Sequence, residues 1–264
     1  MLTGLQAVTF DFGNTLAPVS RAALRLVVEQ AANDVCRRLG VADIVGFLDA
    51  WSEERDRQFR EEVPRFREVE LPRRAVRVMA RLRGMPPPAA TDSWDDVAAA
   101  TRSTDEEIDV IVDAYSRAFV DQIPAPAESG RVIDELAGRG FRLAILSNWP
   151  LAATIDQFAA QAGWTSQLRG IYVSERIGTI KPHPAIFKHV ASSMGVAPAR
   201  ILHVGDDWAA DVVGSLEAGW RAAYLTGRQG DTSLPTSIPS DAHRPDLEIE
   251  RLADLSAQLG DPTP

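Results

Sequence analysis

Polar side chains that can do chemistry follow short apolar stretches at four places in this sequence. They are Asp11, Thr15, Ser147, Asn148, Lys181, Asp206 and Asp211. Lysine is rare in the chain, because Lys181 and Lys188 are the only lysines among 28 basic residues. Lys181 therefore stands out in a sequence that almost always uses arginine.

Each of these positions has a simple structural explanation when taken alone. Ser147 and Asn148 are good N-cap residues for a following helix, and Asp206 suits the positive end of a helix dipole. Taken together they indicate a site. Two carboxylates about 4 Å apart repel by roughly 4 kcal/mol at an effective dielectric near 20, so three gathered aspartates need a cation. Since the ligands are oxygens, Mg²⁺ is the expected ion.

The elements that must position these residues alternate along the second half of the chain. The apolar stretches "FRLAILSN" (141–148), "GIYVS", "ILHVGD" (201–206) and "RAAYLT" alternate with helical patterns such as "LAATIDQFAAQAG" and "PAIFKHVASSMG". This alternation predicts an α/β fold, with a parallel sheet covered by helices on both faces. The carboxyl ends of parallel strands meet at one edge, where ligands bind in such sheets.

Residues 17–125 interrupt this alternation with about 110 mostly helical residues. We therefore predict a Rossmann-like three-layer core formed by residues 1–16 and 126–264, with an inserted all-helical cap formed by residues 17–125. The charged run "WSEERDRQFREE" (51–62) is typical of a solvated helix face. The turn-rich stretch 227–245 is expected to be a surface loop.

Composition excludes several classes of protein. The chain has 264 residues, of which 45% are hydrophobic and 25% charged, and no apolar run reaches the roughly 18 residues that span a membrane. The formal charge of −9 makes a broad nucleic-acid interface unexpected. Cys36 is the only cysteine, and the start of the chain lacks a signal-peptide pattern, so we expect a cytoplasmic location. Oligomeric state leaves no signature that we recognise.

Four motifs resemble those of the haloacid dehalogenase superfamily, in the same order. They are "FDFGNTL", "LAILSN", "SERIGTIKPHPAIF" and "ILHVGDDWAADVVGSLEAG", and the resemblance extends from residue 6 to about residue 225. Most members of that superfamily are Mg²⁺-dependent phosphatases that work through an aspartyl-phosphate. The predicted helical insertion falls where the family carries a cap.

The resemblance implies a role for each residue. Asp11 would be the nucleophile, with Thr15 nearby, and Ser147 would bind the phosphoryl oxygens with Asn148 beside it. Lys181 would neutralise charge on Asp11 and on the phosphoryl group. The metal ligands would be Asp11, the backbone carbonyl of Gly13, Asp206, and Asp211 directly or through water. Asn14 replaces a common glycine, and asparagine tolerates a positive φ well enough to keep the turn.

Gly13 departs from the phosphatase pattern. Phosphatases of the family usually carry an aspartate there as general acid, a contribution worth about 10²–10⁴-fold in rate. Three interpretations stay open: a phosphatase whose leaving group needs little protonation or finds its acid elsewhere, a weakly active or non-catalytic binding relative, and a dehalogenase-type hydrolase. The favoured expectation is a Mg²⁺-dependent hydrolase acting on a small anionic, phosphorylated metabolite, without nucleic-acid or membrane partners.

Overall fold

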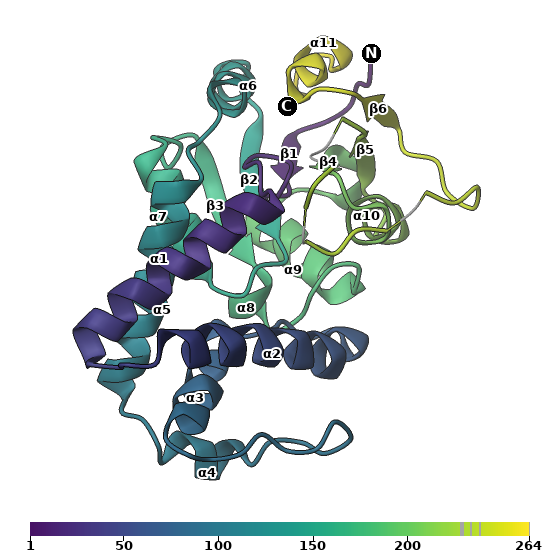
Figure 1. Ribbon diagram of the computed structural model, residues 1–264. Coiled ribbons are helices and arrows are strands. Elements are labelled where there is room, and N and C mark those ends of the chain that lie inside the picture. Colours follow the sequence, from purple (N-terminus) through teal and green to yellow (C-terminus); the bar gives the residue numbers. More distant parts are fainter. Residues whose placement is uncertain (228–229, 233, 238, 264) are drawn as a thin grey trace. The chain divides into compact units, whose positions relative to one another are not determined.

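The computed structural model describes residues 1–227, 230–232, 234–237 and 239–263. The chain divides into two compact units (Figure 1). One unit, here called the sheet unit, comprises Met1–Arg21 and Ile123–Pro264. The other, here called the helical unit, comprises Ala22–Gln122.

A six-stranded parallel sheet forms the centre of the sheet unit. Its strands are β1 (Ala7–Phe10), β2 (Arg142–Ser147), β3 (Leu168–Val173), β4 (Ile201–Gly205), β5 (Arg221–Leu225) and β6 (Leu247–Ile249). They lie in the order β3-β2-β1-β4-β5-β6, and every neighbouring pair is parallel. The predicted α/β, Rossmann-like core is therefore confirmed. Because β1 lies between β2 and β4, the order of strands reverses beside β1, where ligands bind in open α/β sheets.

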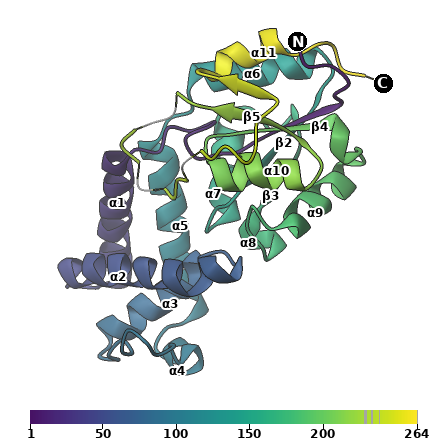
Figure 2. The same cartoon turned by 90° about the vertical axis from the view of Figure 1, so that its right-hand side faces the viewer.

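Helices cover both faces of this sheet, as Figure 2 shows from the side. Every residue of β1 and β4 is buried, which requires cover on both faces. On one face, the α9 side chains Ile186 and Phe187 pack with Leu146 of β2 and Ile201 of β4. The helices of this unit are α6 (Ala127–Gly138), α7 (Ala152–Gln161), α8 (Ser174–Ile177), α9 (Pro184–Met194), α10 (Gly214–Glu217) and α11 (Leu255–Gln258). The shorter helical turns are η2 (Pro198–Arg200), η3 (Trp208–Val213) and η4 (Leu252–Asp254).

The helical unit is built from five helices and one short turn within the described residues. They are α1 (Arg21–Leu39), α2 (Ile44–Glu62), η1 (Val63–Arg65), α3 (Leu71–Leu82), α4 (Asp96–Ala100) and α5 (Asp105–Gln122). Its core contains Trp51, whose ring stacks on those of Phe47 at 5.7 Å and Tyr115 at 5.9 Å between centroids. Asp43 caps α2 by accepting from the Gly46 amide. The unit therefore has its own apolar centre and its own helix-capping contacts.

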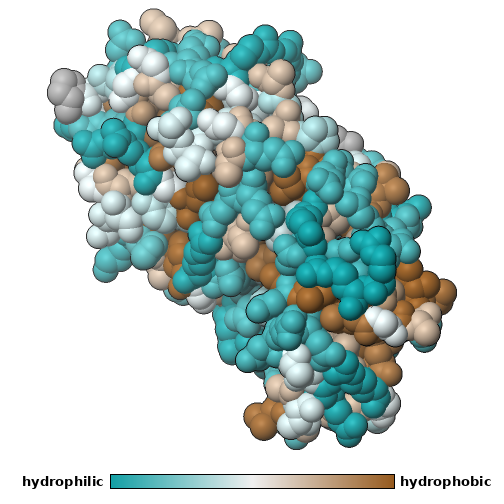
Figure 3. Space-filling view, turned by 90° about the vertical axis from the view of Figure 1, so that its left-hand side faces the viewer, coloured by the Kyte–Doolittle hydropathy of each residue, from teal (hydrophilic) through white to brown (hydrophobic). Residues whose placement is uncertain are grey.

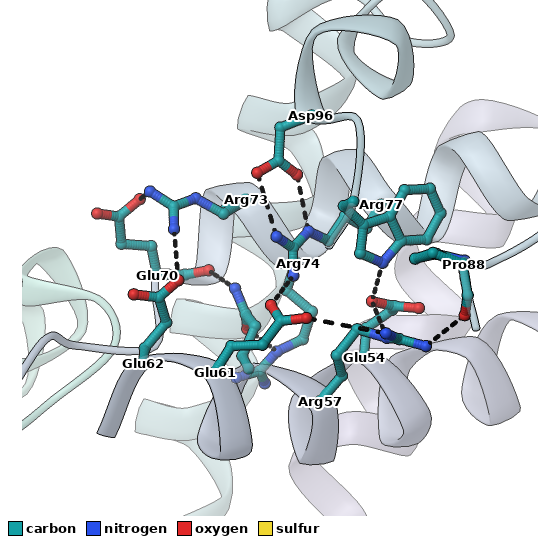
Figure 4. A network of polar contacts seen from close by, with 12 residues as sticks. Glu54, Arg57, Glu61, Glu62, Glu70, Arg73, Arg74, Arg77, Pro88 and Asp96 are labelled. Atoms are coloured by element: carbon teal, nitrogen blue, oxygen red, sulfur yellow. Dashed lines mark hydrogen bonds and ion pairs between the residues drawn. The ribbon is translucent and has the colours of Figure 1, made fainter. Parts of the chain in front are cut away.

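The charged run on α2 is not the solvated face that we expected, because part of it is buried. Glu54 and Gln58 are fully buried, and Figure 4 shows the ion pairs and hydrogen bonds that join α2 to α3 and to the segment before α4. Glu54 accepts from the Trp94 indole at 2.7 Å, and Arg77 pairs with both Glu61 and Asp96. Residues facing solvent and residues facing oppositely charged neighbours have similar compositions, so the sequence pattern did not distinguish them.

The stretch 227–245 contains no helix or strand among its described residues. Its described residues are all exposed or half-buried, as expected of a surface loop, and Thr232, Leu234 and Ser237 are among the half-buried ones. Hydrophilic side chains cover most of the face drawn in Figure 3, with hydrophobic ones showing between them. Among the residues described, we find no helix with both the length and the apolar character needed to cross a bilayer.

Candidate active site

The carboxyl ends of the central strands bring three aspartates together. Asp11 directly follows β1, Asp206 directly follows β4, and Asp211 lies in η3, the turn after β4. Each contributes a carboxylate oxygen to a group in which all the oxygens lie within 4.8 Å of one another. The parallel register of β1 with β4 thus converts a sequence separation of about 200 residues into a single cluster.

Lys181 lies between two of these carboxylates. Its ammonium donates to Asp11 Oδ1 at 2.8 Å, to Asp211 Oδ1 at 2.6 Å and to the Leu146 carbonyl at 2.9 Å. The side chain is almost fully buried. Three acceptors use the three protons of the ammonium, so its orientation is fixed.

The protonation states follow from burial and from the sharing of this ammonium. Burial, together with the charge of Asp211, raises the pKa of Asp11 to about 6, although Lys181 opposes the shift. Burial lowers the pKa of Lys181, but Asp11 and Asp211 outweigh it and hold that pKa above its ordinary value. Burial also opposes ionisation of Asp211, yet Lys181 and His203 keep its pKa below its usual range. Asp211 makes the shorter contact with the ammonium and has more hydrogen-bond donors, so it stays ionised more readily than Asp11.

His203 is a site residue that the sequence did not identify. Its Nε2 lies 3.0 Å from Asp211 Oδ1, and its Nδ1 lies 2.8 Å from the Thr9 hydroxyl. Burial and Lys181 lower the pKa of His203, so the ring is neutral and donates from Nε2 to the carboxylate. Thr9 and His203 are register partners on β1 and β4. The sequence does hold a signal for this pair, because Thr9 and His203 are each the one polar residue in an otherwise apolar strand.

The second motif supplies one group toward Asp11 and one that holds Lys181. Ser147, at the end of β2, is buried, and its hydrogen bond to Asp11 favours the ionised carboxylate. Asn148 instead brackets the Lys181 backbone, donating to its carbonyl at 2.9 Å and accepting from its amide at 2.8 Å. Thr15 reaches Asp206 with its hydroxyl at 3.4 Å. Asn148 therefore acts on the cluster by positioning Lys181.

The turn after β1 has the conformation that its sequence predicts. Asn14 has a φ of 60°, in the left-handed region that asparagine tolerates. Its side chain accepts from the Val19 amide at 3.1 Å and donates to the Thr232 hydroxyl at 3.1 Å. Gly13 precedes it and forms an isolated bridge with Ala17. The chain thus turns sharply just past Asp11.

Gly205 allows the close approach of Asp211 to β4. A Cβ at position 205 would lie 2.2 Å from the Asp211 Cγ. Asp211 Oδ2 also accepts from the Asp207 amide at 2.9 Å. With Lys181 and His203 on Oδ1, the Asp211 carboxylate has three donors and one remaining direction for a further contact.

The donor set fits a divalent cation with oxygen ligands. Counted by formal charge, three carboxylates and one ammonium sum to −2 in a buried cluster. A hard cation such as Mg²⁺ prefers carboxylate oxygens of this kind. Asp11, Asp206 and Asp211 each bring an oxygen to this group, although three donors already occupy most acceptor directions of Asp211.

A parallel Rossmann-like sheet with an aspartate–lysine cluster at its carboxyl edge defines an α/β protein with a hydrolase-type site. Residues 5–219 match the family model of the haloacid dehalogenase-like hydrolases. Because this match covers most of the sequence, the chain belongs to the haloacid dehalogenase-like hydrolase family.

Relatives of known name include phosphatases. The chain is 27% identical over 251 residues to the glyceraldehyde 3-phosphate phosphatase of Methanopyrus kandleri, covering 95% of each chain. It is also 27% identical over 140 residues to the haloacid dehalogenase-like hydrolase domain-containing protein 3 of Mus musculus, which is 53% of this chain and 54% of that protein.

Solved structures of two kinds share the fold. A 2-haloacid dehalogenase from Pseudomonas syringae superposes with a TM-score of 0.63 at 22% identity, covering 96% of this chain and 97% of the other. A HAD phosphatase from Thermococcus onnurineus gives a TM-score of 0.59 at 20% identity, covering 97% and 99%. At these identities the likeness establishes the fold, and the chemistry must be argued from the site.

Proposed function

We propose that this hydrolase is a Mg²⁺-dependent phosphatase that acts on a small phosphorylated metabolite through an aspartyl-phosphate at Asp11. The observation that carries the proposal is the buried cluster of three carboxylates around one lysine. An ion with oxygen ligands would supply charge stabilisation for a phosphoryl group in that cluster. The similarity to phosphatases over most of the chain supports the same activity.

In the proposed reaction one residue attacks phosphorus, and the others neutralise or hydrogen-bond the negative charge. Asp11 is ionised above its pKa of about 6, so its carboxylate can attack phosphorus at neutral pH. Lys181 neutralises charge on Asp11 and on the equatorial phosphoryl oxygens. Ser147 and Thr15 add hydroxyl donors beside them. The bond from phosphorus to the leaving group breaks as the Asp11 oxygen–phosphorus bond forms, and water then releases phosphate and regenerates Asp11.

Metal would be held by Asp11 and Asp206, with the Gly13 carbonyl as a third ligand. We assign Asp211 a contact through water, because Lys181, His203 and the Asp207 amide already occupy most of its acceptor directions. We also propose that the helical unit is the cap that selects the substrate.

The test compares two reactions. Mg²⁺-dependent phosphate release from 4-nitrophenyl phosphate or acetyl phosphate, lost on chelation and regained with Mg²⁺, is the expected result. Metal-independent halide release from a 2-haloacid would contradict the proposal and favour a dehalogenase. Neither activity in a folded, metal-loaded protein would favour a binding role.

A further inference from the structure

The space beside Gly13 is already filled by another part of the sheet unit. A Cβ built on Gly13 would lie 2.5 Å from Leu234 Cδ1 and 3.3 Å from Trp149 Cζ3. Gly13 is not in the positive-φ region, so its backbone conformation would accept a side chain. A side chain at position 13 would instead meet Leu234 Cδ1, the end of a half-buried leucine side chain that would have to move to admit it. Leu234 thus occupies the place where the first side-chain atom of residue 13 would lie.

Two polar anchors hold Leu234 in that place. On one side of it, the Thr232 hydroxyl accepts from Asn14 Nδ2 at 3.1 Å. On the other side, Ser237 donates to the Asp207 carboxylate from its amide at 2.8 Å and from its hydroxyl at 2.9 Å. Asn14 belongs to the loop that follows β1, and Asp207 to the loop that follows β4. The Leu234 contact is therefore tied to both loops that carry the aspartate cluster.

An apolar side chain at this position has a chemical consequence. Position 13 lies two residues after Asp11, where a carboxyl group would serve as proton donor to a departing oxygen. Leu234 and Trp149 fill that direction with methyl and ring carbons. Neither leucine nor tryptophan can act as a general acid at neutral pH.

We infer that Gly13 and Leu234 together determine specificity: Gly13 supplies no acid, Leu234 fills the place of one, and the site is thereby restricted to phosphate donors whose leaving group departs as a stable anion. Acyl phosphates and phosphate esters of acidic phenols or enols belong to this class. The phosphorus–oxygen bond breaks with its electron pair on the leaving oxygen, and that anion needs no proton from the protein. Alkyl phosphates leave as strongly basic alkoxides and are therefore poor substrates. The inference rests on the proposed phosphatase activity of Asp11.

The test uses four proteins: the natural chain, Gly13→Asp, Leu234→Ala and the double variant. Each is assayed with Mg²⁺ on acetyl phosphate, 4-nitrophenyl phosphate, phenyl phosphate and glycerol phosphate. In the natural chain, kcat/KM should fall by about 10²-fold or more from the acidic to the basic leaving groups, the range of a missing general acid. The double variant should regain about 10²-fold on glycerol phosphate. Gly13→Asp alone should gain much less, because Leu234 blocks the new carboxyl group.

Leu216→Ala provides the matched control. Leu216 is a half-buried leucine of α10 packed against the cluster of Trp208, Val212, Ala222 and Tyr224, and the atoms nearest to a Cβ at Gly13 belong to Leu234 and Trp149 instead. Gly13→Asp combined with Leu216→Ala should behave like Gly13→Asp alone. The same four proteins give an assay-independent measurement: Gly13→Asp should lower the urea midpoint more in the natural background than in the Leu234→Ala background.

Each result bears on a separate step. Gly13→Asp could raise kcat/KM on glycerol phosphate equally with and without Leu234, and lower the urea midpoint equally in both backgrounds. Those two results together would overturn the contact between Gly13 and Leu234. The effects of Gly13→Asp and Leu234→Ala could be coupled while the natural chain hydrolyses glycerol phosphate as fast as acetyl phosphate. That result would overturn the leaving-group inference and leave the phosphatase proposal intact. No turnover of any of the four phosphates would contradict the proposed function itself, and the leaving-group inference with it.

Discussion

Asp11 is the residue on which the proposed reaction depends most, because its carboxylate attacks phosphorus. Asp11→Asn keeps the size and most hydrogen bonds of the side chain but removes the nucleophile. We expect the rate of Mg²⁺-dependent phosphate release to fall on the order of 10³-fold or more, while the fold is retained. Steady-state kinetics on acetyl phosphate and near-ultraviolet circular dichroism measure the two effects.

The matched control for Asp11→Asn is Asp156→Asn. Asp156 lies on α7, where it pairs with Arg176 and is partly exposed, and it belongs to no part of the cluster. Asp156→Asn should leave the rate unchanged, whereas comparable losses in the two variants would show that the assay reports general damage rather than a lost nucleophile.

His203 supports the cluster without reaching a reacting atom in our account. His203→Leu removes the donor to Asp211 Oδ1 and leaves the Thr9 hydroxyl without its partner on Nδ1. Losing one partner of a buried polar group costs about 1–3 kcal/mol. We expect the free energy of unfolding to fall by about that amount in urea titrations. A loss below about 0.5 kcal/mol would mean that the contact contributes little.

At the scale of the element, the start of α5 carries a pH-sensitive contact. Glu107 accepts from the Thr104 amide at 2.9 Å, while its own amide donates to the Thr104 hydroxyl at 3.2 Å, forming a capping box. Its hydrogen bond with Arg83, followed by that with Thr104, lowers the pKa of Glu107 to about 2.

Because the folded-state pKa of Glu107 lies below its ordinary value of 4.5, ionised Glu107 stabilises the fold above that value. The stabilisation is lost as pH falls toward 2. Glu107→Gln should therefore unfold at lower urea than the natural chain at pH 7, with the gap closing between pH 4.5 and pH 2. Since Arg83 is more than a third exposed, salt should shrink the gap at pH 7. A gap that widened on acidification would contradict this assignment.

Elements with a simple repeating pattern were predictable from the sequence. The apolar strands β2, β4 and β5, each followed or preceded by a helical pattern, were enough to predict the parallel sheet and hence the meeting of Asp11, Ser147 and Asp206. Contacts set by tertiary packing were not predictable. The burial of Glu54 depends on Trp94 and Arg81, and the position of Leu234 depends on Gly13, more than 200 residues earlier. A local sequence pattern does not predict contacts between residues so far apart in the chain.

At the scale of the whole molecule, the helical unit is inserted into the sequence of the sheet unit, so the chain passes between the two units twice. Within the helical unit, Gln30 in the middle of α1 donates to Asp121 and accepts from Gln122 at the end of α5, so the middle of α1 lies beside the end of α5. Replacing residues 22–122 with a short Gly/Ser linker should leave a folded sheet unit, since its core is its own.

The shortened protein should unfold cooperatively in urea and keep phosphate release from acetyl phosphate, while losing discrimination among larger phosphate esters. A non-cooperative transition would mean that the sheet unit needs the helical unit to fold. Unchanged discrimination in a folded protein would contradict the proposal that the helical unit selects the substrate.

The central claim is that Asp11 attacks phosphorus, and trapping the covalent intermediate tests it most directly. The protein is mixed with acetyl phosphate and Mg²⁺, quenched in acid within the first turnover, digested and mapped by mass spectrometry. The account predicts a phosphoryl group on the peptide containing Asp11, absent from Asp11→Asn and absent without Mg²⁺. A phosphoryl group on another residue, or turnover with no adduct at any quench time, would contradict it.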